Sequence, residues 1–120
     1  LKANMRIVGA VEHAMVLYRD KLPKFNNKGR MVFNWMEYPK ENSVPKIHPT
    51  QKPISLLKKL IELFTDEFEV VIDPVAGSGT TLKAAAEVNR NSYGFEVDKN
   101  FYKEAQEKML DSIQYSFSFD

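Results

Sequence analysis

The residues best suited to chemistry in this sequence form a glycine turn that follows a carboxylate. Asp73 closes the apolar run FEVVID, and Gly77-Ser78-Gly79 leads from it into an alanine-rich stretch typical of a helix. A strand, a turn and a helix in this order place backbone N–H groups and the positive end of a helix dipole at the rim of a sheet. A bound carboxylate or phosphate suits that rim. Taken alone, the glycines are equally consistent with a plain strand-to-helix turn.

Glu96 strengthens the ligand-binding interpretation of this turn. It closes the next predicted strand, within NSYGFEVD, so we expect its carboxylate in the same crevice as the glycines. A carboxylate at the end of the second strand is a natural partner for the paired hydroxyls of a ribose. By itself Glu96 would be read as a surface acid, but the glycine turn before it favours the ribose role.

Two other nucleotide motifs fit the turn less well. A P-loop requires Gly-Lys-Ser/Thr, whereas this stretch has Gly79-Thr80-Thr81 and no lysine before Lys83. A dinucleotide fingerprint requires a third glycine where Leu82 stands, which disfavours a nicotinamide-dependent oxidoreductase.

The stretch HPTQKP, from His48 to Pro53, is the second candidate segment. It places polar side chains between two prolines just before a predicted helix. A rigid helix entry is the simpler interpretation, with Thr50 as a candidate helix cap and Lys52 solvated. His48 and His13 have no cluster of further ligands beside them in the sequence, so we expect no metal site.

The elements that position these residues follow from hydrophobic periodicity. Helices are predicted over Pro53 to Thr65, Gly79 to Val88, and from Lys99 onward, the last with Phe101, Ala105 and Met109 on one face and Ile113 as a weaker fourth. Strands are predicted over Phe68 to Asp73, buried on both faces, and in NSYGFEVD up to Glu96. This alternation predicts an α/β layer with parallel strands and right-handed crossovers.

The first 45 residues are less regular. Ile7 to Val11, Ala14 to Tyr18 and Met31 to Tyr38 are rich in β-branched and aromatic residues and favour strands, the first two as one strand or a hairpin. Between them, Lys21 to Arg30 has the composition of a basic loop, with Phe25 inside it.

Composition limits the class of protein. The 120 residues, 43% of them hydrophobic, suit one domain, and a net charge of +1 argues against a freestanding nucleic-acid binder. The absence of cysteine excludes disulfides and thiolate metal sites. Because no targeting signal and no apolar run of membrane-spanning length is present, we expect a cytoplasmic protein and no membrane partner.

The motifs HPTQKP, DPVAGSGTT and GFEVD, in this order and spacing, closely resemble those of the DNA amino-methyltransferases. These enzymes methylate the exocyclic amine of adenine (N6) or cytosine (N4) with S-adenosylmethionine, many of them in restriction-modification systems of bacteria and viruses. The resemblance is specific for residues 46 to 110 and looser for EHAMVLYRDKLPKFN. It implies one partial domain with a Rossmann-like methyltransferase sheet over residues 1–120: an N-terminal strand or hairpin region at 1–45, then a cofactor-binding α/β region at 46–120.

The resemblance also implies a role for each motif. Asp73 to Thr81 would form the cofactor loop, Glu96 would hold the ribose hydroxyls, Val97 would lie against the adenine, and Thr50 to Pro53 would hold the methionine end. The implied cofactor-binding residues are Thr50, Gln51, Lys52, Pro53, Asp73, Pro74, Gly77, Gly79, Thr80, Thr81, Glu96 and Val97. The family usually has Phe where Val75 stands, so this chain lacks one aromatic wall.

No catalytic residue is assigned, because the family's catalytic motif contains a Pro-Pro pair and this sequence has none. We therefore expect the C-terminal portion of a DNA methyltransferase, which reaches DNA only as part of the complete enzyme and is inactive alone. Missing strands would leave sheet edges unpaired, favouring self-association or a partner chain that supplies them. The alternative is a non-catalytic subunit that binds cofactor or DNA within a larger assembly.

Overall fold

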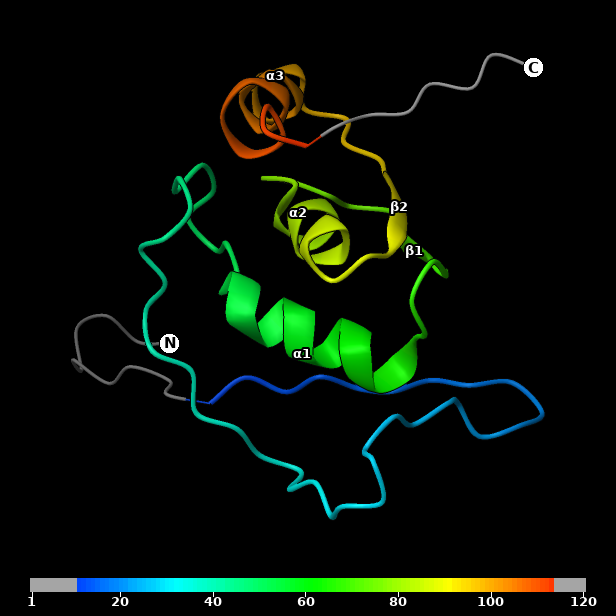
Figure 1. Ribbon diagram of the computed structural model, residues 1–120. Coiled ribbons are helices and arrows are strands. Elements are labelled where there is room, and N and C mark those ends of the chain that lie inside the picture. The colour runs from blue at the N-terminus through cyan, green and yellow to red at the C-terminus, as the bar shows by residue number, and fades with distance from the viewer. Residues whose placement is uncertain (1–10, 114–120) are drawn as a thin grey trace, which may run out of the picture.

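The computed structural model describes residues 11–113, which form a small α/β unit (Figure 1). Helices and strands alternate along the chain from residue 54 onward, as the hydrophobic pattern predicts. The elements are α1 (Ile54–Phe64), β1 (Val70–Asp73), α2 (Thr80–Glu87), β2 (Asn91–Gly94) and α3 (Lys99–Glu104), which continues into a π-helical turn (Ala105–Met109).

The sheet confirms the predicted parallel arrangement. β1 and β2 pair from Val70 opposite Asn91 to Asp73 opposite Gly94, and α2 connects them. Because the strands are parallel, both end at the same edge of the sheet. The segments that follow Asp73 and Gly94 therefore leave the sheet side by side.

The prediction that β1 is buried on both faces is wrong for the described part of the chain. Val70 is 52% exposed and Ile72 64% exposed, and Tyr93 on β2 is 62% exposed. Helix α2 packs on these two strands, so one face of the sheet is covered and the alternate side chains remain open. An apolar face of this kind is unusual on a solvent-exposed sheet.

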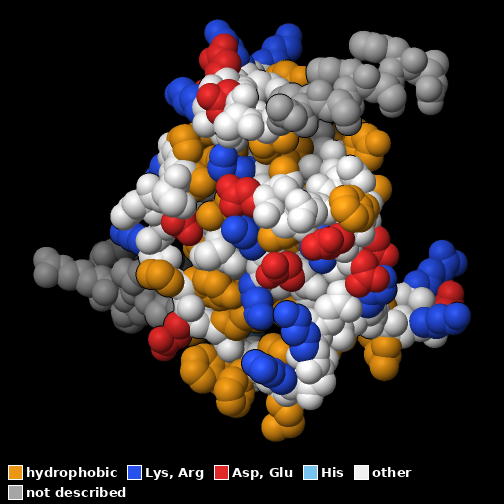
Figure 2. Space-filling view, viewed as in Figure 1, with side chains coloured by type: hydrophobic (Ala, Val, Ile, Leu, Met, Phe, Trp, Pro, Cys, Tyr) orange, Lys and Arg blue, Asp and Glu red, His pale blue; other side chains and the backbone are white. Residues whose placement is uncertain are grey.

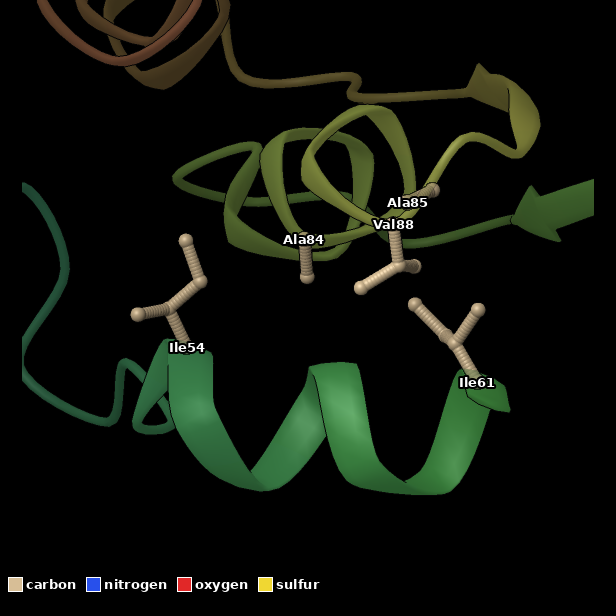
Figure 3. Packing of buried hydrophobic residues seen from close by; sticks show 5 residues of the cluster. All are labelled: Ile54, Ile61, Ala84, Ala85 and Val88. Carbon is tan, nitrogen blue, oxygen red and sulfur yellow. The ribbon is translucent and has the colours of Figure 1, made fainter. Parts of the chain in front are cut away.

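The core lies between α1 and α2 (Figure 3). Ile54 and Ile61 of α1 point toward α2, where Ala84 and Ala85 are fully buried and Val88 completes the cluster. The small alanine side chains allow the two helices to approach closely. Burying each isoleucine contributes about 1.5–3 kcal/mol, so this contact fixes α2 and the turn that precedes it.

The predicted strand or hairpin near the N-terminus is not formed among the described residues. Residues 14–18 and 31–38 have irregular backbone, and the segment after residue 11 runs alongside α1 (Figure 1). Ile7 to Ala10 lie outside the described residues. Strand propensity is realised only where a neighbouring strand pairs the backbone, and the described sheet offers this segment none.

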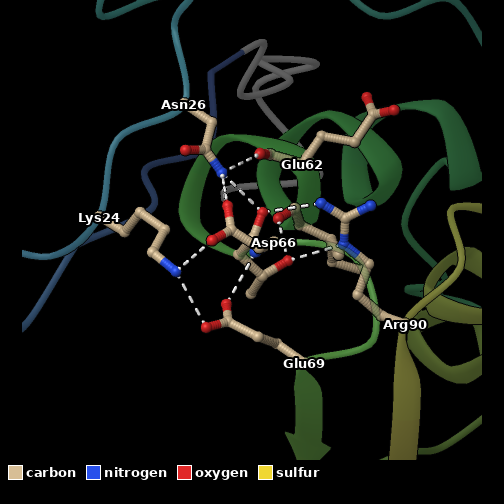
Figure 4. A network of polar contacts seen from close by, with 8 residues as sticks. Lys24, Asn26, Glu62, Asp66, Glu69 and Arg90 are labelled. Atoms are coloured by element: carbon tan, nitrogen blue, oxygen red, sulfur yellow. Dashed lines mark hydrogen bonds and ion pairs between the residues drawn. The ribbon is translucent and has the colours of Figure 1, made fainter.

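A polar network attaches this N-terminal segment to the C-terminal end of α1 (Figure 4). The Asn26 side chain donates to the carbonyl of Thr65 at 2.7 Å, and the Asn26 N–H donates to the carbonyl of Leu63 at 2.7 Å. From the other side, Arg90 Nη2 donates to the same Thr65 carbonyl, also at 2.7 Å. These contacts satisfy carbonyls that a helix end leaves without partners.

An ion pair reinforces the network. Lys24 Nζ lies 2.5 Å from Asp66 and 2.9 Å from Glu69. The hydrogen bond to Asp66, with a second to Glu69, raises the pKa of Lys24, and the Lys24 bond lowers the pKa of Asp66. Because these side chains are largely exposed, the pairs orient the segment more than they stabilise the fold.

The surface mixes both signs of charge. Figure 2 shows lysine, arginine and acidic side chains interspersed over the middle of one face, with hydrophobic side chains along its lower margin. No uniform basic stripe crosses this view. Within residues 11–113, no helix has the length and apolar character needed to cross a membrane.

Replacing Gly94 tests the packing of β2 on α2. A Cβ at this position would lie 2.6 Å from Leu82 Cδ1 and 3.0 Å from Ala76 Cβ. The leucine can rotate, but the alanine has no alternative rotamer, so we expect Gly94→Ala to lower the free energy of unfolding by about 1–3 kcal/mol. Urea unfolding followed by circular dichroism measures this loss. Ser92→Ala, on the same strand, adds no volume and should change stability by less than about 0.5 kcal/mol.

Candidate functional site

The glycine turn begins as a continuation of the sheet. The Phe95 N–H donates to the carbonyl of Asp73 at 3.0 Å, and the Ala76 N–H donates to the carbonyl of Phe95 at 2.9 Å. The Asp73 side chain accepts a hydrogen bond from the Val75 N–H at 3.1 Å. These bonds hold the start of the turn against the chain that leaves β2.

Two glycines then reverse the chain in a conformation that disfavours other residues. Gly77 has φ 52° and Gly79 has φ 76°, both in the left-handed region. Gly79 precedes the first residue of α2, and no side chain caps this helix end. A Cβ at Gly79 would lie 3.4 Å from both Ala105 and Leu110, so the turn also packs closely on the chain after α3. The N-terminal N–H groups of α2 and its positive dipole end stand at the edge where both strands end.

Glu96 is joined directly to this turn. One carboxylate oxygen accepts a hydrogen bond from the Gly77 N–H at 2.8 Å, and the other accepts one from the Asp98 N–H at 2.8 Å. Asp98 in turn caps α3 by accepting from the N–H groups of Asn100 and Phe101. The carboxylate therefore fixes the glycine turn and the start of α3 relative to each other.

The HPTQKP loop is ordered by its own side chains. Gln51 Oε1 accepts from the Ile47 N–H at 3.0 Å, and Gln51 Nε2 donates to the carbonyl of Pro45 at 2.9 Å. Lys52 Nζ forms an ion pair with Glu12 at 2.6 Å. Thr50 is exposed and does not cap α1; that prediction is wrong, because Pro53 occupies the N-cap position and Thr50 bonds to His48 instead.

The loop reaches the site through α3. The rings of His48 and Phe101 lie with their centroids 4.6 Å apart. This contact places residues before α1 beside an element that begins next to Glu96. The structure thus brings the two predicted segments, HPTQKP and the glycine turn, to α3 from different parts of the chain.

A small pocket of about 30 Å³ lies where these elements meet. Gly77, Gly79 and Glu96, which the sequence predicts as site residues, all line it. Tyr102, Gln106 and Leu110 also line it and are not predicted; their helical spacing after Glu96 is the signal that the sequence offers. The full lining is Ala76, Gly77, Gly79, Leu82, Gly94, Glu96, Tyr102, Ala105, Gln106 and Leu110.

The remaining predicted residues do not line this pocket. Thr80 is 3% exposed and its hydroxyl pairs with that of Ser78 at 2.7 Å, whereas Thr81 is half-buried. Pro74 is exposed in the turn, and Val97 is 98% exposed. In the described part of the chain nothing packs over Val97.

A larger cavity, of about 550 Å³, lies at the other end of the core. Asn26, Lys59 and Arg90 are among the residues that line it, and none of the predicted site residues does. We place the candidate site at the smaller pocket, because the uncapped helix end and the tethered carboxylate lie there. Within residues 11–113, no group of three or more His, Asp or Glu side chains is arranged to hold a metal ion.

The chain resembles known proteins over most of its length. The N6/N4 Mtase family, described as DNA methylase, matches residues 10–107. The type II methyltransferase M.HindIII of Haemophilus influenzae is 48% identical over 62 residues, 52% of this chain and 20% of that protein. The DNA adenine methyltransferase YhdJ of Escherichia coli is 30% identical over 108 residues, 88% of this chain and 37% of that protein.

A solved structure shares the fold. The crystal structure of the M1.HpyAVI–SAM complex superposes with a TM-score of 0.64 at 29% identity, covering 76% of this chain and 46% of that one. The chain thus corresponds to less than half the length of each of these relatives.

Removing the Glu96 carboxylate should loosen the glycine turn. Glu96→Ala leaves the N–H groups of Gly77 and Asp98 without charged acceptors. Because the site is half-buried, we expect a loss of about 1–2 kcal/mol in the free energy of unfolding and faster amide exchange at Gly77. Glu107→Ala, an exposed acid after α3, is the control. Unchanged exchange at Gly77 in Glu96→Ala would show that the carboxylate does not hold the turn.

Proposed function

We propose that this chain forms the S-adenosylmethionine-binding part of an enzyme that methylates an exocyclic amine of DNA. The chain belongs to the N6/N4 family of DNA methylases, whose match spans residues 10–107. The amine is N6 of adenine or N4 of cytosine. The observation that carries the proposal is the 2.8 Å hydrogen bond from the Gly77 N–H to Glu96. It joins the two features expected of a nucleoside site, a glycine turn before a helix and a carboxylate at the end of the next strand.

The polar groups at the candidate site suit this cofactor. Each Glu96 oxygen accepts one protein hydrogen bond and retains a further lone pair, so the carboxylate is able to accept both ribose hydroxyls. The uncapped N-terminus of α2, which begins at Thr80, suits a carboxylate such as that of the methionine moiety. In this proposal Thr50 to Pro53 of the HPTQKP loop would hold the same end, and the exposed apolar side chain of Val97 would lie against the adenine.

The chemistry supplied by the cofactor is a methyl group on a sulfonium, which is reactive enough that transfer depends mainly on positioning. This chain's residues orient that donor. They do not orient the acceptor amine, because the sequence contains no Pro-Pro pair on which the family's catalytic motif is built. We therefore propose that the acceptor groups, and the contacts to DNA, come from outside these 120 residues.

The exposed face of the sheet also supports the proposal that part of the enzyme lies outside these 120 residues. Val70, Ile72 and Tyr93 present apolar side chains on strands that pair only with each other within the described residues. Such strands favour pairing with further strands, supplied by a second copy or by a partner chain. We propose that this assembly acts in the cytoplasm of a bacterium or of a viral host cell, where its DNA substrate lies.

A non-catalytic subunit that binds cofactor or DNA is the second candidate, and the same missing Pro-Pro pair favours it. The basic loop Lys21 to Arg30 would be its DNA contact. Two of its members are already engaged, because Lys24 pairs with two carboxylates and the Phe25 ring packs on Phe64 with centroids 5.9 Å apart.

Calorimetric titration of the purified chain with S-adenosylmethionine tests the cofactor proposal. We expect saturable binding that Asp73→Ala and Glu96→Ala weaken by roughly 10-fold or more, since hydrogen bonds to charged groups contribute about 1.5–3 kcal/mol. Glu96→Gln, which keeps an acceptor oxygen, should lose less. Glu107→Ala should bind as the wild type does. The proposal fails if the folded wild-type chain shows no binding.

A methyl-transfer assay distinguishes a chain that only binds the methyl donor from a complete enzyme. We expect no incorporation of labelled methyl groups into DNA by the chain alone. We also expect self-association in sedimentation, because the sheet has an exposed apolar face and unpaired strand edges within the described residues. Measurable methylation would show that this chain also positions the acceptor. A monodisperse monomer would contradict the strand-pairing part of the proposal.

A further inference from the structure

His48 makes two contacts that the proposed cofactor site does not itself require. Its Nδ1 accepts a hydrogen bond from the Thr50 N–H at 3.2 Å. The Thr50 hydroxyl lies 3.0 Å from the same nitrogen. One side chain thus holds both polar groups of Thr50, at the tip of the HPTQKP loop.

The other side of the ring faces α3. His48 and Phe101 lie 4.6 Å apart between ring centroids, with their planes tilted by 54°. Aromatic pairs at such distances stabilise a contact beyond simple burial. The Phe101 N–H is in turn held by Asp98 Oδ1 at 3.1 Å, and the Asp98 N–H donates to Glu96 at 2.8 Å.

These contacts form one continuous path. It runs from Thr50 through His48 and Phe101 to Asp98, then to Glu96 and finally to the Gly77 N–H. It connects Thr50, proposed to hold the methionine end of the cofactor, with Glu96, proposed to hold the ribose. Within residues 11–113, no other hydrogen bond or aromatic contact joins the HPTQKP loop to α3.

We propose that His48 is a positioning residue for S-adenosylmethionine, which couples the HPTQKP loop to α3 and so sets the separation of the two halves of the cofactor site. This inference rests on the proposed function. The ring of His48 docks the loop on Phe101, and its Nδ1 orients Thr50. Neither contact involves a metal or a proton transfer to substrate.

Substitutions at His48 separate the two contacts. His48→Phe keeps an aromatic ring and removes the acceptor, His48→Asn keeps an acceptor oxygen and removes the ring, and His48→Ala removes both. We expect His48→Ala to weaken S-adenosylmethionine binding roughly 10-fold by calorimetry, with His48→Phe and His48→Asn each recovering part of the loss. His13→Ala, at the other, exposed histidine, should bind as the wild type does.

A double-mutant cycle with Phe101→Ala tests whether the residues act together. If His48 acts through Phe101, the double variant binds no more weakly than the weaker-binding single variant, whereas independent roles give multiplied losses. Binding by His48→Ala within twofold of the wild type, or multiplied losses in the double variant, overturns the inference.

Amide hydrogen exchange of residues 46–53 in the chain without cofactor provides a readout that does not depend on binding. We expect faster exchange at Thr50 and Gln51 in His48→Ala and in Phe101→Ala, with unchanged exchange in the α1–α2 core. If the wild-type chain binds no S-adenosylmethionine, the proposed function is wrong. If loop exchange is unchanged in both variants, the coupling through His48 is wrong, whatever the binding experiment shows.

Discussion

The candidate site depends on one hydrogen bond, formed at the edge of the sheet where both parallel strands end. β1 and β2 deliver the glycine turn and Glu96 to this edge, and the Gly77 N–H bonds the Glu96 carboxylate there at 2.8 Å. The α1–α2 core fixes α2, the helix that follows the turn. The second oxygen of the Glu96 carboxylate holds the start of α3 by accepting from the Asp98 N–H. Each element of the candidate site is therefore positioned relative to this carboxylate.

The described residues form a recognisable pocket and also leave apolar side chains exposed. Ala105 and Leu110 pack against Gly79 and form one wall of the pocket. Outside the pocket lining, Val97 is 98% exposed and Ile72 on β1 is 64% exposed. The chain matches 20% of one methyltransferase and 37% of another, so most of the length of each relative lies outside the matched segment. This partial match supports the proposal that the acceptor groups come from outside these 120 residues.

The sequence predicted what depends on local pattern. The spacing of Ile54 and Ile61 identified α1, and the apolar run ending at Asp73 identified β1; the glycine turn and Glu96 followed from strand–turn–helix order. It did not predict what depends on neighbours. Residues 14–18 and 31–38 have the composition of strands but lack a partner strand, and β1 is exposed where a continuous apolar run suggested burial on both faces. The His48–Phe101 contact joins segments far apart in the chain, so no local pattern announces it.

Amide NMR during titration with S-adenosylmethionine tests the central claim most directly, because it reports where the ligand binds. The account predicts the largest shifts at Gly77, Asp98 and Thr50, with little change at Asn26 and Leu63 at the far end of α1. Shifts concentrated around the larger cavity near Asn26 and Arg90, with Gly77 unaffected at saturation, would contradict it.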